Sequence, residues 1–397
     1  MNDLIEYLNI IVSPSSYSHQ QLDELNTTLG DLYSSENIYL TENGRSALYI
    51  AIKALALPPG SKIAVQPFTC NSAVNPIIWN GHIPVYVDID RSTLNMSPSR
   101  FKELLDKESD IRAVLVQYTF GNPTGAQEII QIAHDRGILA IEDCAHALGV
   151  IHDGETLGKK ASMAVISFGL EKTLPTKVGG ALIVNDPNFV SPVEQIYSSI
   201  SYTSRIRTFL WVINPIIRLL SRKSGAFGSN VLIPLFERLG IFNTGFEKSE
   251  LSGGQPRSTP SKLSPLLARV VSHYLGELGI LRSMRSDQVD QYRKSLDWMR
   301  EIGCILPDWN GPFIKFPVIL PEEIDRDELR SFLQNRGSYI SDWYDPVIYP
   351  TGTVLEGVKY MPGTCPLAES VSKQILNLPT GKAFNPKLPD DLKDYLR

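Results

Sequence analysis

The sequence predicts an α/β protein with a mostly parallel central sheet that is covered by helices on both faces. Near-continuous apolar runs of strand length alternate with amphipathic stretches of helical period, which is typical of such sheets. The predicted strands begin at Lys62, Pro84, Arg112, Ile138, Met163 and Ala181. The predicted helices between them span 45–57, 98–107 and 126–137. Ligands of such sheets bind beyond the carboxyl ends of the strands, so informative residues should follow strands directly.

The length and composition allow a second, smaller domain. The chain has 397 residues, of which 43% are hydrophobic, enough for a large core. After the Gly-, Pro- and Ser-rich stretch SGGQPRSTPSK come a long helical pattern over 263–299, the strand PFIKFPVIL and the helix DRDELRSFLQNRG. We expect a large α/β domain over 1–250, with an irregular part at 205–255, and a small α+β domain over 251–397.

Charge and cysteine content exclude some classes of protein. The net charge of −5 argues against a broad nucleic-acid-binding surface. The four cysteines are scattered, and neither they nor the histidines show metal-ligand spacing, so we expect no metal site. Reduced cysteines and an acidic N-terminus without a basic leader predict a cytoplasmic protein.

One apolar run, RIRTFLWVINPIIRLLSRK over 205–223, allows two interpretations. Its uninterrupted part, Thr208–Ile217, is far below the roughly 18 residues that span a bilayer. Arginine flanks and Trp211 are compatible with a helix on a membrane surface. A buried helix or a dimer contact, kinked at Pro215, is the alternative that short apolar runs favour.

Polar residues follow several predicted strands. Asn43-Gly44 precedes the predicted helix that begins at Arg45-Ser46. Such a helix start either binds a phosphate group or is an ordinary N-cap. In IEDCAHALG, Asp143 ends a strand and His146 follows three residues later. That carboxylate could pair with a protonated ring nitrogen or cap a turn.

Two lysines lie in SFGLEKTLPTKVGG, between two predicted strands. Ser167 ends the first strand, Lys172 follows five residues later, and Lys177 precedes Gly179-Gly180. Either lysine could be a solvated loop charge, or one could be a nucleophile held beside a ring.

Together these motifs resemble the DegT-type sugar aminotransferase family of fold-type-I enzymes, which use pyridoxal 5'-phosphate. The resemblance rests on the order of a Gly-led helix start, PFTC, VDID, a strand ending in FGNPTG, IEDCAHALG and SFxxxK followed by GG. It is close over Leu40–Asp186 and looser through LSPLLARVVSHYLGELGILRSMRSDQVDQY and CPLAESVSKQILNLPTG. Asp143 precedes Lys172 by 29 residues, similar to the family.

The resemblance implies a role for each matching residue. Lys172 is implied to hold the cofactor covalently and to move the proton, whereas Lys177 does not match. Asp143 is implied to pair with the pyridinium nitrogen, and His146 with the phenolic oxygen of the ring. The phosphate is implied to lie at the helix start, on the residues Gly44, Arg45, Ser46 and Ser167. Thr69 is implied to lie near the ring face.

The chain departs from the family pattern at two places. Cys70 stands where the family often has an aromatic residue, and Phe68, two residues earlier, is the aromatic residue that could replace it. The region 205–255 has no clear counterpart in the family.

The implied function is transfer of an amino group, by analogy from glutamate, to a keto group of a nucleotide-linked sugar in polysaccharide or glycoconjugate biosynthesis, by a homodimer. NPTG is also seen in amino-acid aminotransferases of the same fold. A sugar dehydratase of this family would carry histidine in place of Lys172. A non-catalytic protein bound to a membrane through 205–223 stays open, whereas a dinucleotide enzyme is disfavoured by the missing GxGxxG.

Overall fold

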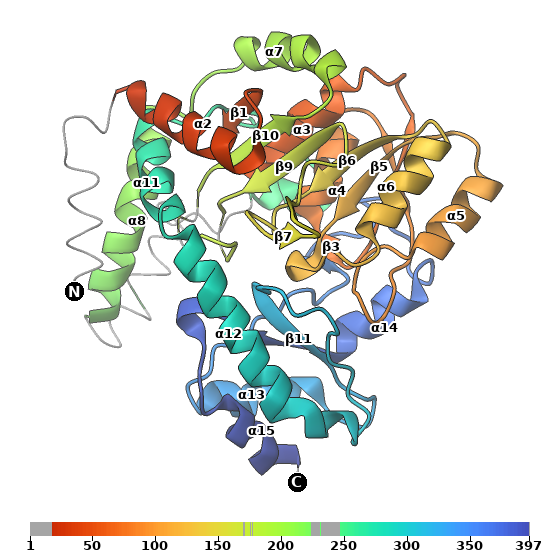
Figure 1. Cartoon of the computed structure of the whole chain (residues 1–397), viewed down its shortest axis with the longest axis vertical. Coiled ribbons are helices and arrows are strands. Elements are labelled where there is room, and N and C mark those ends of the chain that lie inside the picture. The colour runs from red at the N-terminus through yellow and green to blue at the C-terminus, as the bar shows by residue number, and fades with distance from the viewer. Residues whose placement is uncertain are drawn as a thin grey trace.

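The computed structural model describes residues 18–169, 171–174, 176, 178–223, 231 and 247–396. It contains a large α/β part and a smaller part below it, joined along the long helix α12 (Figure 1). The α/β fold class, with a mostly parallel sheet, is confirmed. Lys177 lies outside the described residues, so the prediction that it is a loop charge stays a prediction.

The central sheet has seven strands. Across the sheet they are β1 (Ile38–Thr41), β10 (Gly180–Val184), β9 (Met163–Ser167), β6 (Leu139–Asp143), β5 (Ile111–Gln117), β2 (Lys62–Val65) and β4 (Ile83–Tyr86). The pairs from β9 to β4 are parallel, whereas β10 is antiparallel to both of its neighbours. The six strands that the sequence predicts all lie in this sheet.

Alternation along the strands divides the interior of the large part into two layers. Ala113 and Leu115 of β5 belong to one buried cluster, while Val114 and Val116 belong to the other. Both faces of the strand are therefore buried, which is why its sequence is apolar without interruption. The helices that provide residues to the first cluster include α3 (Gly44–Ala54), α4 (Asn71–Trp79) and α7 (Val190–Ser199). Those of the second include α2 (Gln20–Tyr33), α5 (Pro98–Lys107), α6 (Ala126–Asp135) and α11 (Pro265–Leu275).

The smaller part is built on a two-stranded antiparallel sheet. Its elements are α12 (Leu278–Leu296), β11 (Lys315–Ile319), α13 (Arg326–Asn335), β12 (Ile348–Tyr349), α14 (Pro366–Gln374), β13 (Ile375–Pro379) and α15 (Leu388–Leu396). The domain boundary at 250/251 stays a prediction. Because α11 packs against α2 of the large part, we propose that the change of domain falls between α11 and α12.

Among the described residues, four short strands lie outside both of these sheets. β7 (Ile151–His152) and β8 (Glu155–Thr156) form a hairpin, and β3 (Thr69–Cys70) pairs in parallel with β12 of the small part. The β3–β12 pair therefore joins the two parts of the chain directly beside the carboxyl end of β2.

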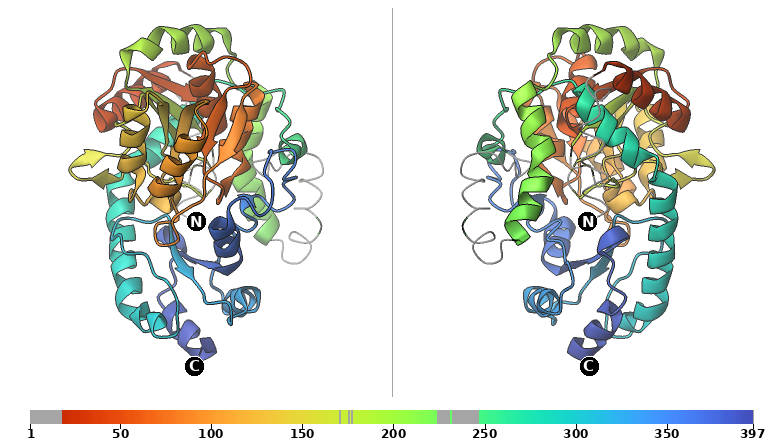
Figure 2. Two further views of the ribbon diagram at one scale, coloured as in Figure 1. Left: turned by 90° about the vertical axis from the view of Figure 1, so that its right-hand side faces the viewer. Right: turned by 90° about the vertical axis from the view of Figure 1, so that its left-hand side faces the viewer.

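The apolar run 205–223 forms one helix, α8 (Arg205–Lys223), alongside the large part (Figure 2). Its first turns are anchored by an ion pair from Arg207 to Glu42 and by the buried Val212. Ile206 and Phe209 are 74% and 61% exposed. Across the described ranges, no helix has the length and apolar character needed to cross a membrane.

Candidate active site

A pocket opens at the edge of the central sheet where the parallel strands end. Gln117, Asp143 and Ser167 are the last residues of β5, β6 and β9, and all three line it. β1 runs parallel to β9 because both are antiparallel to β10, so the start of α3 reaches the same edge. We call Asp143, His146, Ser167 and Lys172, together with the start of α3 at Gly44 and Arg45, the strand-end floor.

The amine of Lys172 points at a histidine in this floor. Its Nζ lies 2.8 Å from His146 Nε2. The backbone N–H of Phe120 donates to His146 Nδ1 at 3.0 Å, so the neutral ring carries its hydrogen on Nε2. Burial and the positive charges of Lys172 and Lys315 hold the pKa of His146 well below its usual value. The imidazole is thus neutral and presents an N–H toward the amine.

Burial also lowers the pKa of Lys172. The negative charges of Asp143 and Glu171 oppose this shift, and the positive charge of Lys315 adds to it. A lowered pKa increases the fraction of neutral amine, which is the form that attacks a carbonyl carbon. The floor therefore contains a nucleophilic amine beside a neutral hydrogen-bonding ring.

Asp143 is buried at the end of β6. One of its oxygens accepts the N–H of Ala145 at 3.0 Å. Burial raises the pKa of Asp143, and the Ala145 N–H and the charge of Lys172 oppose that shift. A buried carboxylate in a pocket is stabilised by a cationic partner, such as a protonated ring nitrogen.

The start of α3 and Ser167 form the other end of the floor. Asn43 caps the helix by accepting the Ser46 N–H at 2.9 Å, and the helix begins at Gly44 with its positive end at the pocket. A side chain at position 44 would bring a Cβ to 3.3 Å from the Ser167 hydroxyl. Glycine thus keeps open a space bordered by a hydroxyl and a helix N-terminus, which suits a phosphate group.

Two of the predicted phosphate residues are already bonded within the protein. Arg45 lines the pocket and forms an ion pair with Glu250, a buried residue in the 205–255 region. Ser46 is buried and does not line the pocket, and its hydroxyl accepts the N–H of Ser261 at 3.3 Å. The structure therefore brings Gly44, Arg45 and Ser167 to the pocket but turns Ser46 away from it.

Thr69 also lines the pocket. Its hydroxyl donates to Gln117, whose amide in turn donates to Thr119 Oγ1 at 2.9 Å. This chain of hydrogen bonds connects the β3 segment to the end of β5.

Sequence reasoning missed the aromatic side chains of the pocket. Trp343, Tyr344 and Tyr349 line it from the small part, and we call them the aromatic wall. Trp211 of α8 lines it as well. The run DWYDPVIYP, unusually rich in aromatic residues, was the available signal, but only the tertiary structure brings it to the floor.

A second lysine, Lys315, is buried close to the floor. Lys315 of β11 forms an ion pair with Glu171 at 3.1 Å, and its Nζ lies 4.9 Å from the ring centre of Tyr339. Glu171 directly precedes Lys172 and lines the pocket. The small part thus places a positive charge near the reactive amine.

The fold and this pocket define an α/β protein with a lysine–carboxylate site at its strand ends. Comparison with protein families shows that the chain belongs to the DegT/DnrJ/EryC1/StrS aminotransferase family, whose model matches residues 8–210 and 233–394. The resemblance that the sequence motifs indicated is confirmed.

Individual relatives are distant. GDP-perosamine synthase of Escherichia coli O157:H7 is 32% identical over 144 residues, a match that covers 36% of this chain and 39% of that protein. The dTDP-4-amino-4,6-dideoxy-D-glucose transaminase of Shigella dysenteriae is 24% identical over 100% of this chain and 94% of its own length. The crystal structure of ntda from Bacillus subtilis with bound cofactor PMP superimposes with a TM-score of 0.73 at 20% identity, over 99% of this chain and 81% of that one.

Proposed function

We propose that this chain is a pyridoxal-5'-phosphate-dependent aminotransferase. It takes an amino group from glutamate and transfers it to a keto group of a nucleotide-linked sugar, in polysaccharide or glycoconjugate biosynthesis. The observation that carries the proposal is the Lys172 amine, 2.8 Å from the neutral His146 and in one pocket with the buried Asp143. Family membership and the names of the two sugar-modifying relatives support the substrate class.

The residues present fit this cofactor. Lys172 supplies the amine for covalent attachment, Asp143 a carboxylate for the ring nitrogen, and His146 an N–H for the ring oxygen. The space that Gly44 keeps open above Ser167 suits the phosphate.

The protein's part in the reaction follows from these groups. When bound, the cofactor supplies an electron sink for negative charge at the carbon that bears the amino group. Asp143 keeps the ring nitrogen protonated, and Lys172, once its amine is free, takes the proton from the donor α-carbon and returns it as a general acid. The lowered pKa of Lys172 suits this exchange near neutral pH.

Replacing Lys172 tests the proposal, and Lys177, the other lysine of the same sequence segment, provides the control. Lys172→Ala should abolish the visible absorption band of the lysine-bound cofactor and all turnover, because it removes the amine that attacks the carbonyl. Lys177→Ala should keep both. A Lys172→Ala protein that still turns over would refute the assignment.

The spectrum of the wild-type protein with pyridoxal phosphate separates the alternatives. A band that glutamate bleaches supports a transaminase, and an assay of keto-sugar nucleotides against free keto acids then separates the sugar enzyme from an amino-acid aminotransferase. A folded protein without any band would favour a non-catalytic role.

We further propose a homodimeric, cytoplasmic protein with a peripheral membrane contact through α8. The exposed Ile206 and Phe209, next to Arg205, support that contact. Flotation with anionic vesicles, compared between wild type and Ile206→Ser/Phe209→Ser, tests it.

A further inference from the structure

The β3 segment, which ends beside the floor, contributes no aromatic side chain to the pocket. Cys70 is half-buried there, with its Sγ 3.4 Å from Ser72 Oγ. Phe68, two residues earlier, is buried behind the wall, where its ring meets that of Tyr344 edge-on at 5.3 Å between centres. Neither Phe68 nor Cys70 therefore presents the face of an aromatic ring to the pocket.

The neighbouring strand places an aromatic residue at this position. β12 lies parallel to β3, with Ile348 opposite Thr69 and Tyr349 opposite Cys70. The carbonyl of Val347 accepts the backbone N–H groups of Phe68 and Thr69, at 2.8 and 3.2 Å. Both Tyr349 and Cys70 line the pocket, so the tyrosine ring stands next to the thiol at the same surface.

The other two residues of the aromatic wall are engaged with the floor. The Trp343 ring stacks on His146, with 5.1 Å between centres and 12° between planes, and Lys172 Nζ lies 4.5 Å from its centre. The Tyr344 hydroxyl lies 3.1 Å from His146 Nε2. Tyr349 meets both rings at steep angles, 60° and 64°, so its face is turned differently from theirs.

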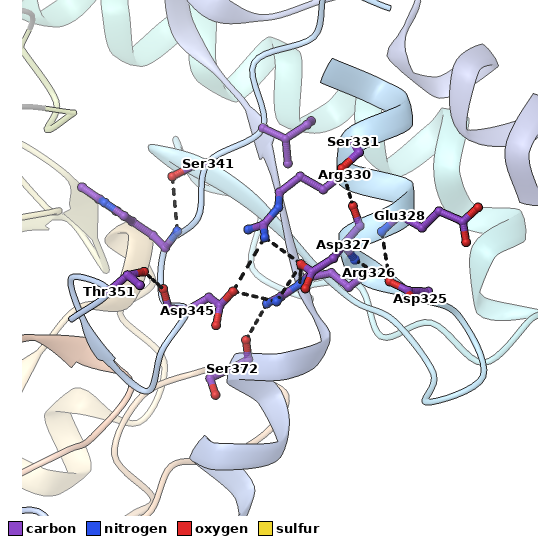
Figure 3. Close-up of polar contacts among 12 residues, drawn as sticks. Asp325, Arg326, Asp327, Glu328, Arg330, Ser331, Ser341, Asp345, Thr351 and Ser372 are labelled. Carbon is purple, nitrogen blue, oxygen red and sulfur yellow. Dashed lines mark hydrogen bonds and ion pairs between the residues drawn. The ribbon is translucent and has the colours of Figure 1, made fainter. Parts of the chain in front are cut away.

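The small part holds this wall in place through a buried arginine. Arg326 of α13 donates to Asp345 at 2.6 Å and to the carbonyl of Ser372 at 2.8 Å (Figure 3). The hydroxyl of Thr351 donates to the carbonyl of Asp345 at 3.2 Å. The segment between Tyr344 and Tyr349 is therefore fixed by the protein itself, which is what a preorganised binding surface needs.

We infer that Tyr349 supplies the stacking face for the pyridine ring of the bound cofactor, in place of an aromatic residue at position 70. An electron-poor flat ring gains from an offset aromatic neighbour beyond the area that it buries. The inference rests on the proposed function, because it assumes that the pocket binds this ring. It assigns part of the cofactor site to the small part of the chain.

The test measures noncovalent affinity with pyridoxamine 5'-phosphate, which cannot form the bond to Lys172. Quenching of tryptophan fluorescence reports its Kd in the wild type, Tyr349→Phe and Tyr349→Leu. Tyr349→Phe keeps the aromatic ring, so its Kd should lie within about twofold of the wild-type value. Leu keeps apolar bulk without a ring face and should weaken binding roughly 3- to 10-fold.

A rescue variant and a control exclude a merely structural effect. Adding Cys70→Phe to Tyr349→Leu should restore most of the affinity, since it returns a ring to the same surface. Tyr202→Leu, at an exposed tyrosine outside the pocket, should leave the Kd unchanged. Thermal melting of each variant verifies that it is folded.

The outcomes distinguish the inference from the function on which it rests. If the wild type binds pyridoxamine phosphate and Tyr349→Leu binds equally well, the stacking role is overturned while the proposed function stands. If the folded wild type binds neither this compound nor pyridoxal phosphate, both are overturned.

Discussion

The strand-end floor and the aromatic wall face each other across one pocket but are built in different ways. The floor consists of residues at the ends of neighbouring parallel strands, and its Lys172 and His146 are 26 residues apart in the chain. The wall comes from the small part, where Tyr344 reaches His146 from 198 residues away. The floor carries the reactive groups, whereas the wall supplies flat surfaces, and Lys315 of the small part adds a nearby positive charge. We therefore expect floor variants to lose chemistry and wall variants to lose affinity or to change pH dependence.

The largest effect should follow from Asp143→Asn in the floor. The amide cannot keep a ring nitrogen protonated, so the rate of the glutamate half-reaction should fall roughly 10²- to 10³-fold, as when other preorganised charge stabilisers are removed. Rapid mixing with glutamate measures this rate.

Asp153→Asn, at an exposed turn that does not line the pocket, is the matched control and should keep the wild-type rate. If Asp143→Asn reacts with glutamate at the wild-type rate, Asp143 does not stabilise the reaction, and the role assigned to it is wrong.

The second effect concerns the contact between the floor and the irregular region at 205–255. Glu250 is buried and pairs with Arg45, and its backbone carbonyl accepts from Asn71 and Asn75 at 3.1 and 2.9 Å. Glu250→Ala leaves the arginine without this partner and should lower the free energy of unfolding by about 3 kcal/mol. Urea denaturation measures the change.

The exposed pair Arg100–Glu103 provides the comparison. Both side chains are more than half exposed, so Glu103→Ala should cost less than about 1 kcal/mol. Equal losses in the two variants would mean that the 205–255 region does not stabilise the floor.

The smallest effect should be a shift in the pH dependence of cofactor attachment, caused by a substitution in the small part. Lys315→Gln removes a positive charge near Lys172 and leaves the negative charge of Glu171 without its ion-pair partner. Both changes stabilise the ammonium form, so the pKa of Lys172 rises. The pH profile of covalent cofactor attachment, trapped with borohydride, should then move to higher pH.

Lys382→Gln at an exposed lysine is the control and should leave the profile in place. A shift of the Lys315→Gln profile toward lower pH would contradict the electrostatic coupling between Lys315 and Lys172.

The sequence by itself determined six of the seven strands of the central sheet and most of the floor. Uninterrupted apolar runs mark strands that are buried on both faces, and the edge at which parallel strands end follows from that topology. The motifs around Asp143, Ser167 and Lys172 were therefore enough to place these residues together. Ser46 shows the limit of this reasoning, because a helix start predicts a seat for a phosphate but not which side chains face it.

Only the tertiary structure decided which distant residues contact the floor and form the other side of the pocket. Glu250 pairs with Arg45 over a separation of 205 residues, and Tyr349 stands beside Cys70 because β12 pairs with β3. Such contacts leave no periodic signal in the sequence, since each depends on how two separately folded segments pack. Local sequence patterns determine the helices and strands and where they end. Contacts between residues that are distant in the chain are determined by packing and by the pairing of buried charges.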